Sequence, residues 1–320
     1  GLGHNALKEN TTGSLNTAVG ALAMDACTTA SNCTAVGYTA LGSLTTGFRN
    51  IGVGQNALGS LTTGIYNVAV GTFANQNATT ASSNVAMGYH ALNQTTTGGN
   101  LVGIGYECLA ANTTGGDNVA VGSIALDANT TGSANTAIGK GALTSNTTAS
   151  NNVAVGTFSL MSNTTGTSNV GVGYDSLAVN TEGDNNTAIG FQANRQQTTG
   201  NNNTSVGYHA ARATTTGSQN VAVGSSALDA NTTAENNTAV GHASLGANTT
   251  GYSNTAVGSL SLDSNSTGFF NTAVGENALG ANTTANSNTG LGARALMVNS
   301  TGANNTAVGV ECLDACTTGS

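Results

Sequence analysis

The side chains that could do acid–base or metal chemistry are few and stand apart from one another. The 320 residues include four histidines and fourteen acidic residues. Catalysis and metal binding need such groups to converge at one point. His4, His90, His209 and His242 occupy positions that other parts of the chain fill with Tyr, Gln, Ser, Lys or Asp, which is typical of exposed sites. We therefore expect no enzyme, no metal and no cofactor.

Aspartates and glycines suggest two further kinds of site, and their spacing speaks against both. Asp229 and Asp263 are the closest pair in a set that recurs at multiples of seventeen residues. They would lie roughly 10 Å apart on a stacked sheet. A calcium ion takes ligands at about 2.3–2.6 Å, so it cannot use both carboxylates. Triplets such as Gly52-Val53-Gly54 lack the third glycine of a nucleotide-binding fingerprint.

Asparagine offers a covalent site, because the chain repeats the sequon Asn-x-Thr/Ser. A glycan on each copy would coat the protein. The other interpretation is that Asn and Thr form ladders and turns. The candidate glycosylation sites are Asn10, Asn112, Asn129, Asn146, Asn163, Asn231, Asn248, Asn265, Asn282 and Asn299.

Five cysteines are too few to crosslink the whole chain. Cys27 and Cys33 flank a short turn, and they are the candidate disulfide. Such a bond would suit an oxidising extracellular setting. Cys108 and Cys312 occupy positions otherwise held by Ala or Ser, so we interpret them as small buried apolar residues.

The elements that position all these residues follow from one strict repeat. Glycine recurs every seventeen residues in nineteen copies, from Gly3 to Gly309. A period this short is the mark of a solenoid, in which each repeat forms one coil stacked on the previous one. Nothing replaces this glycine, which indicates a positive φ or a close approach of backbone. The candidate turn glycines include Gly20, Gly37, Gly156, Gly258 and Gly309.

The residues before each glycine alternate in type and predict a short strand. The last is aliphatic, the one before it is Ala, Gly or Ser, and the one before that is Thr, Val or Ile. Side chains alternate between the two faces of a strand. We expect the aliphatic residue to face the interior, against the leucine that follows the glycine by four positions. The small residues would then form a bare outer face that another chain can approach. In a homotrimer, either this small face or the aliphatic face would lie near the common axis.

These patterns predict an all-β protein. The fold is a parallel β-solenoid, or β-roll, of about nineteen coils that runs as one continuous region over 1–320, as a segment of a longer chain. The 45 glycines disfavour helix, and the fixed aliphatic positions disfavour disorder. The net charge is −8 and the six basic residues are scattered, which argues against nucleic acid. No apolar run is long enough to span a membrane.

The core of the repeat resembles a known family over essentially the whole chain, as one copy illustrates. Asn135-Thr136-Ala137-Ile138-Gly139 and the following Gly141-Ala142 look like the head repeats of YadA-like trimeric autotransporter adhesins, and like repeats of related trimeric fibre and phage tail-fibre proteins. The resemblance implies a left-handed roll, three chains packed side by side, and a place outside the cell, on a cell or virion surface. The units of that family are typically shorter than these seventeen-residue units.

Three functions are compatible with such a chain. The leading one is an adhesive or structural extracellular fibre segment, with glycans as an optional decoration, whose main partner is itself as a homotrimer. A slender coil has a thin core, so association would bury much more apolar surface. The alternatives are a phage or virus tail-fibre shaft and an ice-binding solenoid that presents a ladder of threonines.

Overall fold

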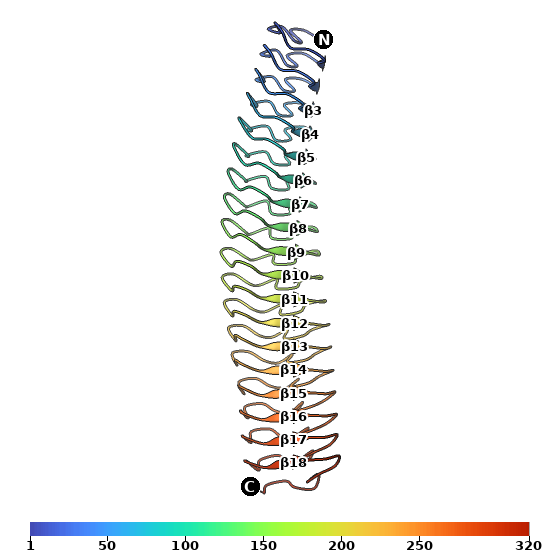
Figure 1. Ribbon diagram of the computed structural model, residues 1–320, viewed down its shortest axis with the longest axis vertical. Coiled ribbons are helices and arrows are strands. Elements are labelled where there is room, and N and C mark those ends of the chain that lie inside the picture. The colour runs from blue at the N-terminus through green and yellow to red at the C-terminus, as the bar shows by residue number, and fades with distance from the viewer. Residues whose placement is uncertain (320) are drawn as a thin grey trace. The chain divides into compact units, whose positions relative to one another are not determined.

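A computed structural model describes residues 1–319, which form an all-β chain without a helix. Three-residue strands recur every seventeen residues, and each pairs in parallel with its neighbours along the chain (Figure 1). The predicted parallel β-solenoid with seventeen-residue coils is therefore confirmed. There are eighteen strands among the described residues rather than nineteen, because the first copy contributes only a single bridge from Leu2 to Val19.

The chain divides into two compact units, Gly1–Phe158 and Ser159–Ser320, each a stack of the same coil. The first unit contains β1 (Thr17–Val19), β2 (Thr34–Val36), β3 (Ile51–Val53), β4 (Val68–Val70), β5 (Val85–Met87), β6 (Val102–Ile104), β7 (Val119–Val121), β8 (Thr136–Ile138) and β9 (Val153–Val155). The second contains β10 (Val170–Val172), β11 (Thr187–Ile189), β12 (Thr204–Val206), β13 (Val221–Val223), β14 (Thr238–Val240), β15 (Thr255–Val257), β16 (Thr272–Val274), β17 (Thr289–Leu291) and β18 (Thr306–Val308).

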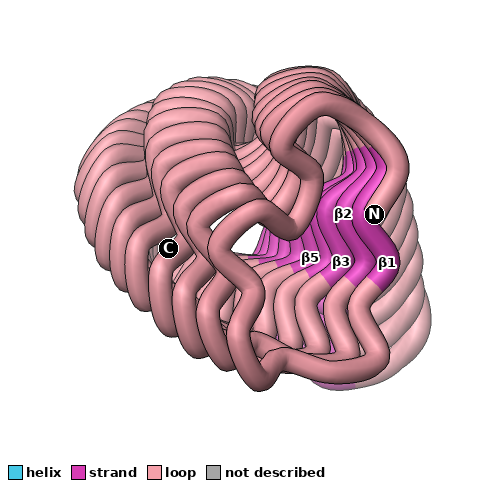
Figure 2. Tube along the Cα trace, turned by 90° about the horizontal axis from the view of Figure 1, so that it is seen from above, coloured by secondary structure: helices cyan, strands magenta, loops and turns pink. Residues whose placement is uncertain are grey.

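Each coil has one strand, and loops form the rest of its circumference (Figure 2). Register is kept to the residue, so that Ala256 lies beside Ala273 and Val257 beside Val274. The loops also bond from coil to coil: the Leu245 amide donates to the Ser261 carbonyl at 3.0 Å. Identical positions therefore stack along each unit, and every column of the sequence becomes a row on the molecule.

The recurring glycine is required by both its conformation and its neighbours. Gly20, Gly37, Gly156, Gly258 and Gly309 all have φ between 130° and 138°, a region that side-chain-bearing residues rarely adopt. A Cβ on Gly258 would also lie 2.5 Å from the carbonyl oxygen of Gly275 in the next coil. Both reasons anticipated from the sequence apply.

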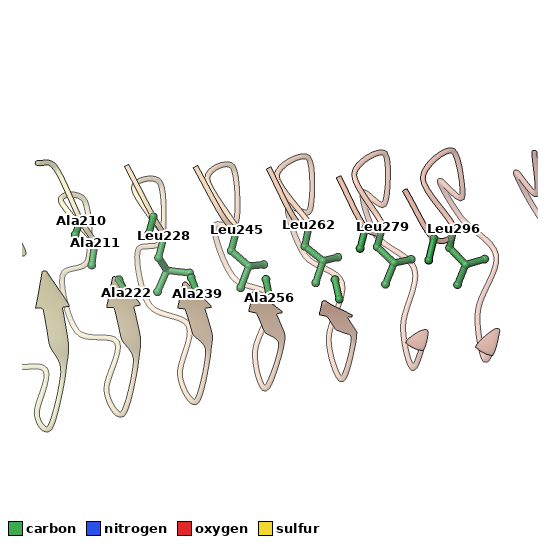
Figure 3. Packing of buried hydrophobic residues seen from close by; sticks show 14 of the residues in the cluster. Ala210, Ala211, Ala222, Leu228, Ala239, Leu245, Ala256, Leu262, Leu279 and Leu296 are labelled. Carbon is green, nitrogen blue, oxygen red and sulfur yellow. The ribbon is translucent and has the colours of Figure 1, made fainter. Parts of the chain in front are cut away.

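The expected orientation of the strand is wrong. The middle residue of each strand, which is Ala, Gly or Ser, faces the interior and is buried, as Ala256 is at 0% exposure. It packs against the buried leucines of the loop, such as Leu245 and Leu262 (Figure 3). The physical reason is space: a Cβ built on Gly52 would already lie 3.2 Å from Leu41 Cγ. A valine cannot fit there, so the β-branched residues point outward.

Two rows of asparagine complete the interior. The side chain of Asn254 donates from Nδ2 to the Gly268 carbonyl at 2.8 Å, and its backbone N–H donates to Asn237 Oδ1 at 3.0 Å. Asn248, in the other row, donates from Nδ2 to the Gly251 carbonyl at 2.8 Å. Buried polar groups need such partners. The asparagines therefore act as internal braces that link neighbouring coils and close the loop.

Candidate interaction surfaces

The outward face of the strands is apolar along both units. We call the last residues of β1–β18 the outer aliphatic row; all eighteen are Val, Ile, Leu or Met. None is buried, and Val36, Ile138 and Leu291 are 37%, 40% and 45% exposed. Monomeric soluble proteins rarely expose a contiguous apolar surface of this extent. The row is therefore the leading candidate for a contact surface.

A second outward row lies beside it. We call the first residues of β1–β18 the outer mixed row. In β3–β7 these are Ile51, Val68, Val85, Val102 and Val119, all aliphatic. In β14–β18 they are Thr238, Thr255, Thr272, Thr289 and Thr306. Val and Thr have similar shape, so the two stretches present nearly the same relief but differ in polarity.

The two adjacent threonines of each coil have different roles. The first bonds to the next coil: Thr232 Oγ1 donates to the Thr249 carbonyl at 3.2 Å, and Thr249 Oγ1 to the Ser266 carbonyl at 3.0 Å. The second lies nine residues after each invariant glycine, is exposed in every copy from Thr12 to Thr318, and is replaced only by Glu182. We call these exposed side chains the outer threonine row. They point away from the coil, so packing does not explain their regularity.

The predicted glycosylation sites lie on the wrong side of the backbone. Nine of them are 0% exposed, and each donates from Nδ2 to the carbonyl three residues further on, as Asn112 does to Gly115 at 3.0 Å. Nδ2 is the atom that would carry a glycan, so modification does not fit the folded coil at Asn112, Asn129, Asn146, Asn163, Asn231, Asn248, Asn265, Asn282 and Asn299. Asn10 alone among the ten is exposed.

The predicted disulfide is absent, because Cys27 and Cys33 are free thiols. Each occupies an interior asparagine position, where Cys27 Sγ lies 3.8 Å from the Ala30 carbonyl and Cys33 Sγ 3.7 Å from that of Gly47. Burial raises the pKa of both thiols. Cys108 is buried as expected, with its pKa raised by burial to about 12, whereas Cys312 is only partly buried.

The remaining titratable groups are dispersed. Residues 1–319 hold no group of three or more His, Cys, Asp or Glu that could bind a metal ion. Two of the aspartates that recur at multiples of seventeen residues have partners. Asp127 accepts a hydrogen bond from Thr144 Oγ1 at 2.6 Å, and Asp229 forms an ion pair with Arg212 at 3.0 Å. His90 stacks on Tyr89 and His209 on Tyr208, with ring centroids 4.1 and 3.8 Å apart.

An aromatic column was missed by the sequence analysis. Tyr174, Phe191 and Tyr208 directly follow the invariant glycine in three successive coils and stack with centroids 5.4 and 5.5 Å apart. All three are exposed by 44–53%. The seventeen-residue spacing of aromatic residues in one column was the signal that could have identified this stack.

No family model, curated protein or solved structure matches this chain. The part of the chain that the structure describes contains no helix capable of crossing a membrane.

Proposed function

We propose that this chain is a segment of an extracellular structural or adhesive fibre, in which three copies associate through their outer aliphatic rows. The proposal places the protein on a cell or virion surface, with itself as its principal partner. Its surface is suited to a static role, since charged residues are only 6% of the chain and Asn, Thr, Ser and Gly dominate the rest.

The outer aliphatic row is the observation that carries the proposal. The interior of the coil is already filled by the small middle residues and the loop leucines, so this row adds little to the core of a single chain. Burying a valine or isoleucine side chain contributes up to about 1.5–3 kcal/mol. A row that is aliphatic eighteen times therefore provides a strong drive to associate.

The contact face differs from one of the two considered from sequence. The Ala, Gly and Ser positions lie inside the coil and cannot meet another chain. The β-branched face remains, and its residues stack in register from strand to strand, which would allow copies to align side by side. Three slender coils can each cover part of this face on the others, which is the arrangement that the family resemblance implies.

Sedimentation velocity at micromolar concentration tests the assembly. We expect a particle of three times the 31.2 kDa chain mass. The variant Val240→Asp/Val257→Asp/Val274→Asp places charges on the outer aliphatic row and should sediment as a single chain. The matched control, with aspartate at Thr233, Thr250 and Thr267 of the outer threonine row, should keep the wild-type mass. A wild-type chain that sediments as a monomer would contradict the proposal.

The outer threonine row favours a second candidate function, ice binding. Regular exposed threonines carry a hydroxyl and a methyl group at a repeat of about 4.8 Å along the sheet direction. Thermal hysteresis of the wild-type protein would support this function. Loss of that hysteresis in a Thr216→Lys/Thr233→Lys/Thr250→Lys variant would locate it on this row, whereas the absence of hysteresis in the wild type would exclude it.

A further inference from the structure

The second unit carries a groove of about 420 Å³ on the loop side of two neighbouring coils. Its wall contains two amides and two guanidinium groups, from Gln192, Gln196, Arg195 and Arg212. The two arginines occupy the same position of the repeat in successive coils, which places their backbones about 4.8 Å apart. The chain has only six basic residues, so this pairing is the densest cationic feature of its sequence.

The two arginines are held in place but are not saturated. Arg195 Nε donates to Asp175 Oδ2 at 3.2 Å. Arg212 donates from Nε to Asp229 Oδ1 at 3.0 Å and from one terminal nitrogen to Oδ2 at 3.3 Å. A guanidinium has five N–H donors. Both terminal nitrogens of Arg195 and one of Arg212 therefore keep donors that residues 1–319 do not use.

The charges near the groove follow a symmetric order from coil to coil, with the two cations in the middle. Asp175, Arg195, Arg212 and Asp229 come from four successive coils, so two carboxylates flank two adjacent cations. His209 adds no charge near neutral pH, because burial and the nearby Arg212 lower its pKa. The flanking carboxylates offset part of the repulsion between the two neighbouring cations, and an anion between the cations would offset more of it. The centre of the groove therefore favours one negative group, and its ends disfavour a polyanion of high charge density.

The fold does not require arginine at these positions. The same position of the repeat holds Gly42, Ala110, Thr144, Met161 and Asp263 in other coils, with the coil unchanged. The two arginines are therefore a local feature of these two coils and are not needed for the repeat to fold. Phe191 and Tyr208, which are 44% and 53% exposed, directly precede Gln192 and His209 and border this region with aromatic surface.

We propose that this groove binds an acidic carbohydrate, a uronate-bearing glycan, with its carboxylate between Arg195 and Arg212. Guanidinium groups match a carboxylate in geometry and charge. The side-chain amides of Gln192 and Gln196 pair with ring hydroxyls. The volume lies within the range of small-ligand sites and holds one or two sugar rings. This inference rests on the proposed adhesive function and names its ligand class.

Isothermal titration of the full chain with an oligogalacturonate tests the proposal. We expect binding to the wild type, and at least about tenfold weaker binding by Arg195→Gln/Arg212→Gln, because charge-assisted hydrogen bonds are lost. The matched control, Arg49→Gln/Arg294→Gln, removes the same charge from exposed sites elsewhere and should bind like the wild type. A methyl-esterified oligogalacturonate lacks the negative charge and should bind neither the wild type nor any of the variants.

Thermal unfolding and sedimentation of each variant separate loss of fold from loss of binding. Any of three results would overturn the proposal. The wild type and the Arg195→Gln/Arg212→Gln variant could bind the oligogalacturonate equally well, or the wild type could bind the oligogalacturonate and its methyl ester equally well. The third is that the wild type does not bind the oligogalacturonate. An assembled protein that fails to bind overturns this inference alone. Binding by a protein that sediments as a single chain overturns the proposed assembly and leaves the groove in place.

Discussion

The two faces of each strand obey opposite restrictions. The inward middle residue is always Ala, Gly or Ser, whereas the outward last residue varies in size from Val to Leu and Met but is never polar. Inside, the opposing loop leucines limit volume. Outside, no atom of the same coil limits volume, yet polarity is still restricted. The inner face is therefore restricted by folding, and we propose that the outer face is restricted by a contact beyond the single coil.

The largest effect should come from emptying the inner face. Leu262 is fully buried, and Leu262→Ala should lower the free energy of unfolding by about 2–5 kcal/mol, because it leaves a cavity. Chemical denaturation measures this loss of unfolding free energy. The Leu262→Ala change is made in the Val240→Asp/Val257→Asp/Val274→Asp variant, so that both proteins compared are single chains. In the same background, Leu291→Ala on the outer face should cost much less. Equal costs would remove the distinction between the faces.

Overfilling the inner face should have the next largest effect. Ala256→Val adds two methyl groups where the strand meets Leu245 and Leu262, and should cost about 1–3 kcal/mol of unfolding free energy. Val257→Ile, one residue further on, adds a methylene to the outer face and should leave the single chain nearly unchanged. If Ala256→Val melts at the wild-type temperature, the interior is larger than the structure shows.

Exchanging Val and Thr should sharpen the contrast between the two stretches of the outer mixed row. Val68→Thr/Val85→Thr/Val102→Thr introduces three hydroxyls into the aliphatic stretch of the proposed contact. A homotrimer would bury nine such hydroxyls, at about 1 kcal/mol or more each. The half-assembly concentration varies as the square root of the trimer dissociation constant, so it should rise about a thousandfold or more. The reverse exchange at Thr238, Thr255 and Thr272 should lower it. Sedimentation equilibrium measures both, and no change in either would argue that this row is solvated.

The effect that is smallest at neutral pH concerns Cys108, which occupies an inward small position and affects stability only in alkali. Its folded pKa is raised to about 12 by burial, above the unfolded value of about 8.5. The unfolded chain therefore releases this proton first, so stability declines as pH rises from about 8.5 towards 12, by up to about 1.4 kcal/mol per pH unit. Cys108→Ala should lack this decline. A thiol reagent at pH 8 should spare Cys108 and modify an Ile104→Cys variant of the monomeric background. Modification of folded Cys108 would place it outside.

The repeat, the strands and the turn glycines were predictable, because a fixed period and alternation follow directly from the geometry of a coil. Which face of the strand points to the interior was not predictable, because alternation of residue types defines two faces without showing which one is buried. The usual preference for aliphatic residues inside fails here, since the interior width is set by leucines of the opposing loop. The decisive signal was size: the Ala256 column accepts nothing larger than serine, while the Val257 column accepts methionine.

The same error about which side chains face inward explains why buried asparagines were predicted as glycosylation sites. Asparagine before threonine is a sequon on an exposed loop, but a brace when its side chain faces a carbonyl inside the coil, as Asn248 does. The arginine groove could not be found from sequence either. The seventeen-residue spacing of Arg195 and Arg212 does place them in neighbouring coils, but it does not show the groove or the aspartates that pair with them.

Thiol accessibility on the outer aliphatic row tests the central claim most directly. Ile189, 40% exposed in one chain, is replaced by cysteine in a Cys312→Ser/Cys316→Ser background, and Thr199→Cys on the outer threonine row serves as the reference. If the row is covered by other copies, the cysteine at 189 will react much more slowly than that at 199 at micromolar concentration. The two rates will converge when Val240, Val257 and Val274 are replaced by aspartate. Equal rates without those aspartates would show that the row faces water, and would contradict the account.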